Sequence, residues 1–216
     1  MYYIYPYFSD DKNRAVNGAA DLEDQKLSPQ KFSIAYPFII TKQDKKVKDK
    51  LNSEIINTVS ELFKKQVLLP EMVDFNEVLG VYETMVNKNY ILSILFSIYT
   101  YVNMAAHGLT VYSALTVNTE TAKVYSFSDL FNSKMDYLGY LTRIAEKYIK
   151  DNNIQLINEY QGVTNNQEFY LTEDKLVLYY QVYEYTPYYY GIFKIPIPYT
   201  EIKPLLWPMS PINKLI

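Results

Sequence analysis

The sequence predicts an α+β fold, in which a mainly antiparallel sheet carries two main helices packed on one face. Two segments, 44–65 and 136–150, have apolar residues at the three- and four-residue spacing of amphipathic helices. Residues 90–102 and 109–117 alternate apolar and mixed residues, which is the period of a strand. Helix, strands, helix and strands follow one another without strict βαβ alternation, and this order favours the α+β class.

The elements of the N-terminal half follow from composition and spacing. Residues 1–30 are polar and acidic, so we expect an irregular arm there, with one strand at 2–8. Residues 32–40 have the composition of a strand, and Pro37 places this strand at an edge or a bulge. The helix at 44–65 has one apolar stripe, formed by Val47, Leu51, Ile55, Val59 and Leu62. Three strands are then expected, at 78–86, 90–102 and 109–117.

The strand at 90–102 predicts how the helices pack. Its aliphatic face is formed by Leu92, Ile94, Phe96 and Ile98. We expect both helices to cover this face, with Leu51, Ile55 and Val59 of the first helix buried against it. The opposite face of the sheet would then show serine, threonine and tyrosine side chains.

The C-terminal half is expected to continue the same sheet. A short strand at 124–125 and a helical turn at 126–131 precede the second helix, for which Ser133 and Asp136 have capping-box spacing. A final hairpin pairs 176–185 with 192–197, where Pro196 and Pro198 indicate an edge strand, and a short helix follows at 199–206. The domain scheme is an arm, 1–30, and two parts, 31–118 and 119–216, which share one continuous core and sheet.

Composition excludes several classes of function. The formal net charge of −3 argues against nucleic acid, and the absence of cysteine excludes disulfides and thiolate metal sites. No run reaches the roughly 20 apolar residues of a membrane helix. Residues 1–7 lack the basic region and long apolar core of a secretory signal, so we expect either none or one that has been removed.

No motif in the sequence supplies obvious chemistry. The one histidine, His107, has no metal-ligand spacing around it, and no Gly-x-Ser-x-Gly elbow or phosphate-binding loop is present. We therefore expect no metal, no cofactor and no catalytic residue, although paired carboxylates from distant positions would still permit a hydrolase. We interpret His107 as a turn residue that bonds backbone between two strands, next to Gly108 with a positive φ angle.

Tyrosine is the unusual residue of this chain, with 24 copies against 6 glycines. Tyrosine side chains are rigid and amphipathic, which favours them in recognition surfaces. They concentrate in the loop Thr186-Pro-Tyr-Tyr-Tyr-Gly191. Because successive side chains diverge, Tyr188, Tyr189 and Tyr190 cannot all enter one core, and at least one ring should be exposed.

A group of short motifs resembles a bacterial family. These are Tyr99-x-Tyr101, Ala106-His-Gly108, Phe127-Ser-Asp-Leu-Phe131, Phe169-Tyr-Leu and Tyr183-x-x-x-Pro187-Tyr188-x-x-Gly191. The pattern resembles the extracytoplasmic domain of RsiV-type anti-sigma factors, which are lysozyme receptors. Residues 32–57, with Tyr36-Pro37 and Leu51-Asn52, resemble the companion N-terminal domain that also precedes PdaC-type peptidoglycan deacetylases. The chain departs from the family at Asn103-Met-Ala105, where glycines are usual, and at Ala122, where a hairpin glycine is usual.

The resemblance implies an extracytoplasmic, secreted or cell-surface domain, and three hypotheses follow. The first is a non-catalytic binding domain for lysozyme or a related muramidase. Its partner-binding residues would be Pro187, Tyr188, Tyr189, Tyr190 and His107. The second is a module that binds peptidoglycan or another carbohydrate by stacking tyrosine rings on sugars. The third is an uncharacterised hydrolase.

Overall fold

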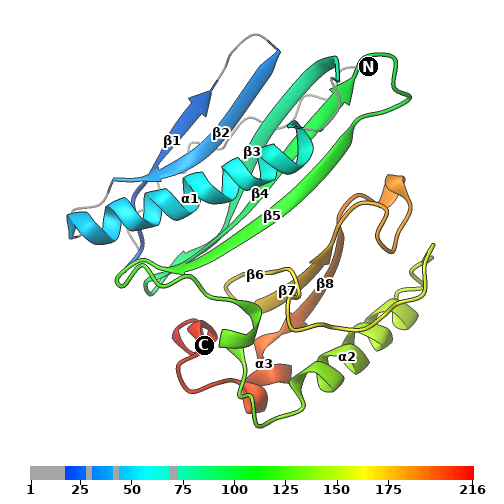
Figure 1. Cartoon of the computed structure of the whole chain (residues 1–216). Helices are drawn as coiled ribbons and strands as arrows, with labels where there is room; N and C mark the ends of the chain where they lie inside the picture. The colour runs from blue at the N-terminus through cyan, green and yellow to red at the C-terminus, as the bar shows by residue number, and fades with distance from the viewer. Residues whose placement is uncertain (1–17, 28–30, 41–43, 69–72) are drawn as a thin grey trace.

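The strands form two sheets in place of the single sheet expected from the sequence (Figure 1). The computed structural model describes residues 18–27, 31–40, 44–68 and 73–216. The five-stranded sheet has its strands in chain order: β1 (Leu22–Leu27), β2 (Phe32–Ile39), β3 (Phe75–Lys88), β4 (Ile91–Val102) and β5 (Leu109–Asn118). The three-stranded sheet consists of β6 (Phe169–Leu171), β7 (Lys175–Tyr180) and β8 (Phe193–Pro198).

The α+β class and the mainly antiparallel pairing are confirmed. Within both sheets every neighbouring pair is antiparallel except β2 and β3, which pair in parallel from Phe32 to Ile34. Pro37 lies beyond this short pairing, where β2 has only β1 beside it. The strand β1 falls inside the arm expected to be irregular, and the strand expected at 2–8 lies outside the described residues.

The first helix packs as the sequence indicates. α1 (Lys45–Gln66) begins at the N-cap Asp44, whose side chain accepts a hydrogen bond from the Lys46 backbone N–H at 2.7 Å. Its apolar stripe and the aliphatic face of β4 form one core, which contains Leu51, Ile55, Leu92, Ile94, Phe96 and Ile98, with Val59 partly buried against it. The buried Asn52 bonds the backbone N–H and carbonyl of Ile39, at 2.8 and 3.1 Å, and so joins α1 to β2.

The expectation that both helices share this face is not confirmed. α2 (Tyr137–Asp151) lies along the three-stranded sheet, away from α1 (Figure 1). Its buried Leu141 and Ala145 belong to a second core, with alternate residues of the short strands: Phe169, Leu171, Leu176, Leu178, Phe193, Ile195 and Ile197. The helix is capped by Asp136 itself, which accepts from the Gly139 N–H at 3.1 Å, and not by the expected Ser133 box.

The second face of each sheet contacts the other sheet. In β7, Val177 and Tyr179 point opposite to the residues facing α2 and pack with Tyr170 and with Leu95 of β4. Ser93 of β4, expected on an uncovered face, is buried and accepts a hydrogen bond from the Leu171 N–H at 3.0 Å. The order of layers is therefore α1, five-stranded sheet, three-stranded sheet and α2.

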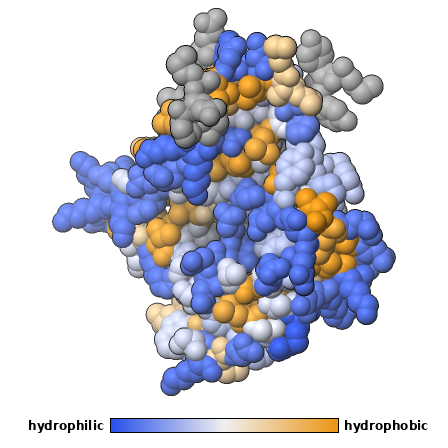
Figure 2. Space-filling view, turned by 45° about the vertical axis from the view of Figure 1, so that its right-hand side comes forward, coloured by the Kyte–Doolittle hydropathy of each residue, from blue (hydrophilic) through white to orange (hydrophobic). Residues whose placement is uncertain are grey.

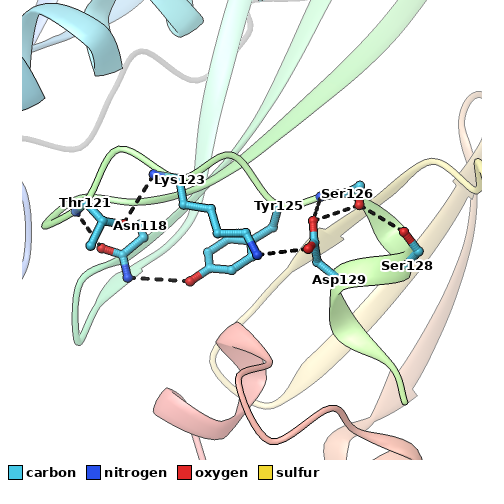
Figure 3. A network of polar contacts seen from close by, with 7 residues as sticks. All are labelled: Asn118, Thr121, Lys123, Tyr125, Ser126, Ser128 and Asp129. Atoms are coloured by element: carbon cyan, nitrogen blue, oxygen red, sulfur yellow. Dashed lines mark hydrogen bonds and ion pairs between the residues drawn. The ribbon is translucent and has the colours of Figure 1, made fainter. Parts of the chain in front are cut away.

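The segment between β5 and α2 is fixed by a polar network (Figure 3). The Asn118 Oδ1 accepts hydrogen bonds from the backbone N–H groups of Glu120 and Thr121, at 2.9 and 3.0 Å. Asp129 of the 3₁₀ turn η1 (Phe127–Leu130) bonds the Ser126 N–H at 2.8 Å and pairs with Lys123 at 2.8 Å. Although burial disfavours its charge, these bonds from Lys123 and Ser126 hold the pKa of Asp129 below its usual value.

The chain ends in short helical segments beneath the second core. α3 (Tyr199–Ile202) and η3 (Lys203–Leu205) confirm the short helix expected at 199–206, and η4 (Pro211–Lys214) follows. β8 is an edge strand, as its prolines predict. Within the described residues, no helix combines the length and the apolar character needed to cross a membrane.

Candidate functional site: an aromatic patch

Two loops far apart in the sequence meet at one end of the molecule. His107 lies in the connection between β4 and β5, and Tyr188 opens the 3₁₀ turn η2 (Tyr188–Tyr190) between β7 and β8. Their rings are stacked, with centroids 4.0 Å apart and planes inclined by 24°. The structure thus brings His107 and the tyrosine loop, which the sequence identified separately, into direct contact.

His107 is held by hydrogen bonds on both ring nitrogens. Its Nδ1 lies 3.0 Å from the Gly108 carbonyl oxygen, and its Nε2 lies 3.2 Å from the Tyr183 hydroxyl. In a neutral imidazole, Nδ1–H donates to the carbonyl and Nε2 accepts from the hydroxyl. The expected bond from this turn histidine to the backbone is confirmed.

Gly108 is needed for space and not for backbone freedom. Among the described residues it is not one of those with positive φ, so that expectation is wrong. A Cβ placed on Gly108 would lie 2.2 Å from Cε2 of Tyr99, so the Tyr99 ring fills the place of a side chain. The left-handed conformations lie nearby instead, at Met104 with φ 64° and Tyr183 with φ 71°. Such angles are costly for residues other than glycine and are retained where the surroundings enforce them.

The tyrosine loop presents its three rings in three directions. Pro187 precedes η2 with φ −63°, and Gly191 ends the turn with φ 70°. Tyr188 turns toward His107, while the Tyr190 ring packs edge-on against Phe193 at 5.8 Å. Tyr189 is 78% exposed. The expectation that at least one of the three rings faces solvent is confirmed.

We define the aromatic patch as His107, Tyr183, Tyr188, Tyr189 and Tyr190. Tyr183 is 45% exposed and its ring lies 5.8 Å from that of Tyr188, so it belongs to the same surface. The sequence-based site omitted Tyr183, although the residue opens the Tyr183-x-x-x-Pro187-Tyr188 motif. Partial burial, with Tyr148 and Tyr189 nearby, raises the pKa of Tyr190 above its usual value, so this hydroxyl is neutral at physiological pH.

The patch offers contact surface and hydrogen-bonding hydroxyls. In the part of the chain that the structure describes, no three histidine or acidic side chains gather as metal ligands would. The view in Figure 2 shows strongly apolar residues as separate islands among polar ones, without one continuous apolar face. Amphipathic tyrosine rings therefore supply binding surface here without a large aliphatic patch.

Comparison with known proteins gives a family match for one segment of the chain and a shared fold for most of it. Residues 128–200, from η1 to α3, match the family described as Protein of unknown function (DUF3298). A DUF3298 family member from Bacteroides fragilis NCTC 9343 is similar with a TM-score of 0.67 and 17% identity, over 93% of this chain and 99% of its own. A DUF3298 family protein from Pseudomonas aeruginosa PAO1 is similar with a TM-score of 0.65 and 13% identity, over 91% of this chain and 96% of its own. The chain shares the fold of these proteins. None of the curated proteins matches it.

Proposed function

We propose that this protein is a non-catalytic binding domain of the cell envelope, and that the aromatic patch contacts its partner. The observation that carries the proposal is the exposure of the Tyr189 ring. This ring lies in solvent on a turn in which the neighbouring Tyr188 stacks on His107. The resemblance of the His-Gly and Pro-Tyr-x-x-Gly loops to RsiV-type domains suggests lysozyme or a related muramidase as the partner. The same resemblance suggests an extracytoplasmic location.

The geometry suits a protein anchor for two physical reasons. A tyrosine ring has few rotatable bonds, so ordering it on binding costs little free energy. The stack of Tyr188 on His107 restrains the loop before a partner arrives, which reduces the ordering cost further. A ring of this kind that enters a cleft of the partner contributes about 2 kcal/mol or more to binding when it acts as a hot spot.

The test is a calorimetric titration of lysozyme against the wild-type chain and the Tyr189→Ala variant. We expect binding by the wild type and a loss of roughly thirtyfold in affinity for the variant. Tyr90→Ala is the matched control, because Tyr90 is 39% exposed and occupies the turn at the opposite end of β4. An unchanged affinity for Tyr189→Ala would remove the patch from the interface, and no binding by the wild type would exclude lysozyme as partner.

A carbohydrate module is the second candidate, favoured by the exposed tyrosines Tyr183 and Tyr189. Sugars stack on exposed tyrosine rings, so insoluble peptidoglycan would retain the wild type and release the Tyr189→Ala variant. Retention on peptidoglycan without binding to lysozyme would favour this candidate over the first. Turnover of either material by the purified chain would favour the third hypothesis, a hydrolase.

A further inference from the structure

A groove runs between α1 and the edge strand β5, apart from the aromatic patch. It has a volume of about 470 Å³, within the usual range of ligand sites. Its α1 wall includes Leu62, Lys65 and Gln66, and its other wall is the 111–114 stretch of β5. Glu168 and Gln181, from either end of the β6–β7 hairpin, close one side. We call this the α1–β5 groove.

Glu168 presents a carboxylate to this groove without a cationic partner. Its Oε2 accepts a hydrogen bond from Gln181 Nε2 at 2.7 Å. This amide donor is neutral, and no ion pair involves Glu168 within the described ranges. Part of the residue remains exposed, but the groove removes enough water that burial raises the pKa of Glu168 above its usual value, opposed by the Gln181 bond.

The position of this carboxylate is fixed by the fold. The Gln181 amide oxygen accepts from the Tyr112 N–H at 3.0 Å, and its Nε2 donates to the Tyr112 carbonyl at 2.9 Å as well as to Glu168. Both amide hydrogens of Gln181 are therefore used, and the side chain cannot rotate without losing three hydrogen bonds. A cation that enters the groove would meet an acceptor already oriented and partly desolvated, which reduces the cost of pairing.

The remaining lining favours a long cation with several donors. Leu62 and Val111 pack against the core under α1 and offer apolar contact for an aliphatic stem. Gln66 donates from its Nε2 to Thr100 and Leu109, and no described residue donates to its amide oxygen, which can therefore accept a hydrogen bond. Ser113 adds a hydroxyl. A guanidinium carries five N–H donors in one plane and matches a carboxylate with two parallel bonds, whereas an ammonium is a compact point charge.

We propose that the α1–β5 groove binds the side chain of an arginine presented by a peptide or protein, with Glu168 as its carboxylate partner. This inference goes beyond the proposed function and does not depend on which partner contacts the aromatic patch. Lys65 also lines the groove and lies near enough to favour the charge of Glu168, although the two form no ion pair among the described residues. Lys65 therefore opposes an incoming cation.

The test is a titration of the isotope-labelled chain with N-acetyl-arginine methylamide, followed by the backbone amide signals of Tyr112, Ser113 and Gln181. We expect saturable shifts for the wild type and an affinity at least roughly tenfold lower for Glu168→Gln. Glu168→Asp keeps the negative charge but moves the carboxylate back by one methylene, so this variant should also bind arginine more weakly. It is the control for the case in which Glu168→Gln loses binding only because its fold is disturbed. Lys65→Gln should bind more tightly than the wild type, the opposite direction.

Two further ligands distinguish the alternatives. N-acetyl-lysine methylamide should bind more weakly than the arginine derivative, and equal binding would overturn the assignment to a guanidinium. If free arginine bound more tightly than the blocked derivative, its α-amino and carboxyl groups would be recognised. That result would overturn the inference that the arginine is presented by a peptide or protein. Absence of saturable shifts, or unchanged binding by Glu168→Gln with a native spectrum, would overturn the site itself. None of these readouts involves lysozyme or peptidoglycan. Failure of the groove proposal therefore does not bear on the aromatic patch, and failure of the aromatic-patch proposal does not bear on the groove.

Discussion

Replacing His107 with alanine should destabilise the fold measurably and weaken partner binding without abolishing it. The substitution removes one stacked ring pair, which contributes about 0.5–1.5 kcal/mol. It also removes the hydrogen bonds to Gly108 and Tyr183, each with a net contribution of about 0.5–1.5 kcal/mol and at the low end here because the imidazole is exposed. We therefore expect a loss of about 1–3 kcal/mol in the free energy of unfolding.

Urea unfolding of four chains measures the part that belongs to the stack. These are the wild type, His107→Ala, Tyr188→Ala and the double variant, which together form a double-mutant cycle. The coupling energy should be about 0.5–1.5 kcal/mol, because each single variant already breaks the same ring contact. Tyr183→Phe is the control that removes only a hydroxyl and leaves the stack in place. A coupling energy below about 0.3 kcal/mol would refute the view that the stack holds the tyrosine loop.

Three further predictions concern the core, a buried hydroxyl and pH. Phe96 is 1% exposed under α1, so Phe96→Ala should cost about 3–5 kcal/mol in urea unfolding; a loss below about 1 kcal/mol would contradict its place in the core. The Thr186 hydroxyl is buried without a hydrogen-bond partner among the described residues, so Thr186→Val should leave the midpoint unchanged or raise it, and a lower midpoint would reveal a partner. Because the folded pKa of Glu168 is raised above 4.5, the wild type should lose stability relative to Glu168→Gln as pH rises through that folded pKa; parallel stability curves from pH 4 to 8 would contradict this.

The sequence predicts the first helix and its sheet well because both patterns are local. The stripe of α1 and the alternation of β4 each specify a buried face, and these faces meet. The place of α2 could not be obtained in this way, since an amphipathic stripe shows that a face is covered and not by which element. A signal for the second sheet was present in Leu176-Val-Leu-Tyr-Tyr180, a continuous apolar run typical of a strand covered on both faces. In the single sheet expected from the sequence, this run is one half of the final hairpin, and the second face of that sheet stays uncovered.

The hydroxyl residues of β4 show that a polar pattern, like an apolar one, does not reveal which groups the side chains contact. Serine at alternate positions predicts contact with water, yet the Ser93 hydroxyl lies 2.8 Å from Thr116 Oγ1 of the neighbouring strand β5 and accepts a hydrogen bond from the Leu171 N–H of the other sheet. Polarity in a strand indicates that hydrogen-bonding partners are required, and these can be protein groups as well as solvent.

The aromatic patch follows the same reasoning. The divergence of three successive tyrosine side chains predicted an exposed ring. The stack of His107 on Tyr188 depends instead on how the β4–β5 and β7–β8 connections meet once both sheets have packed, which no local pattern in either loop contains.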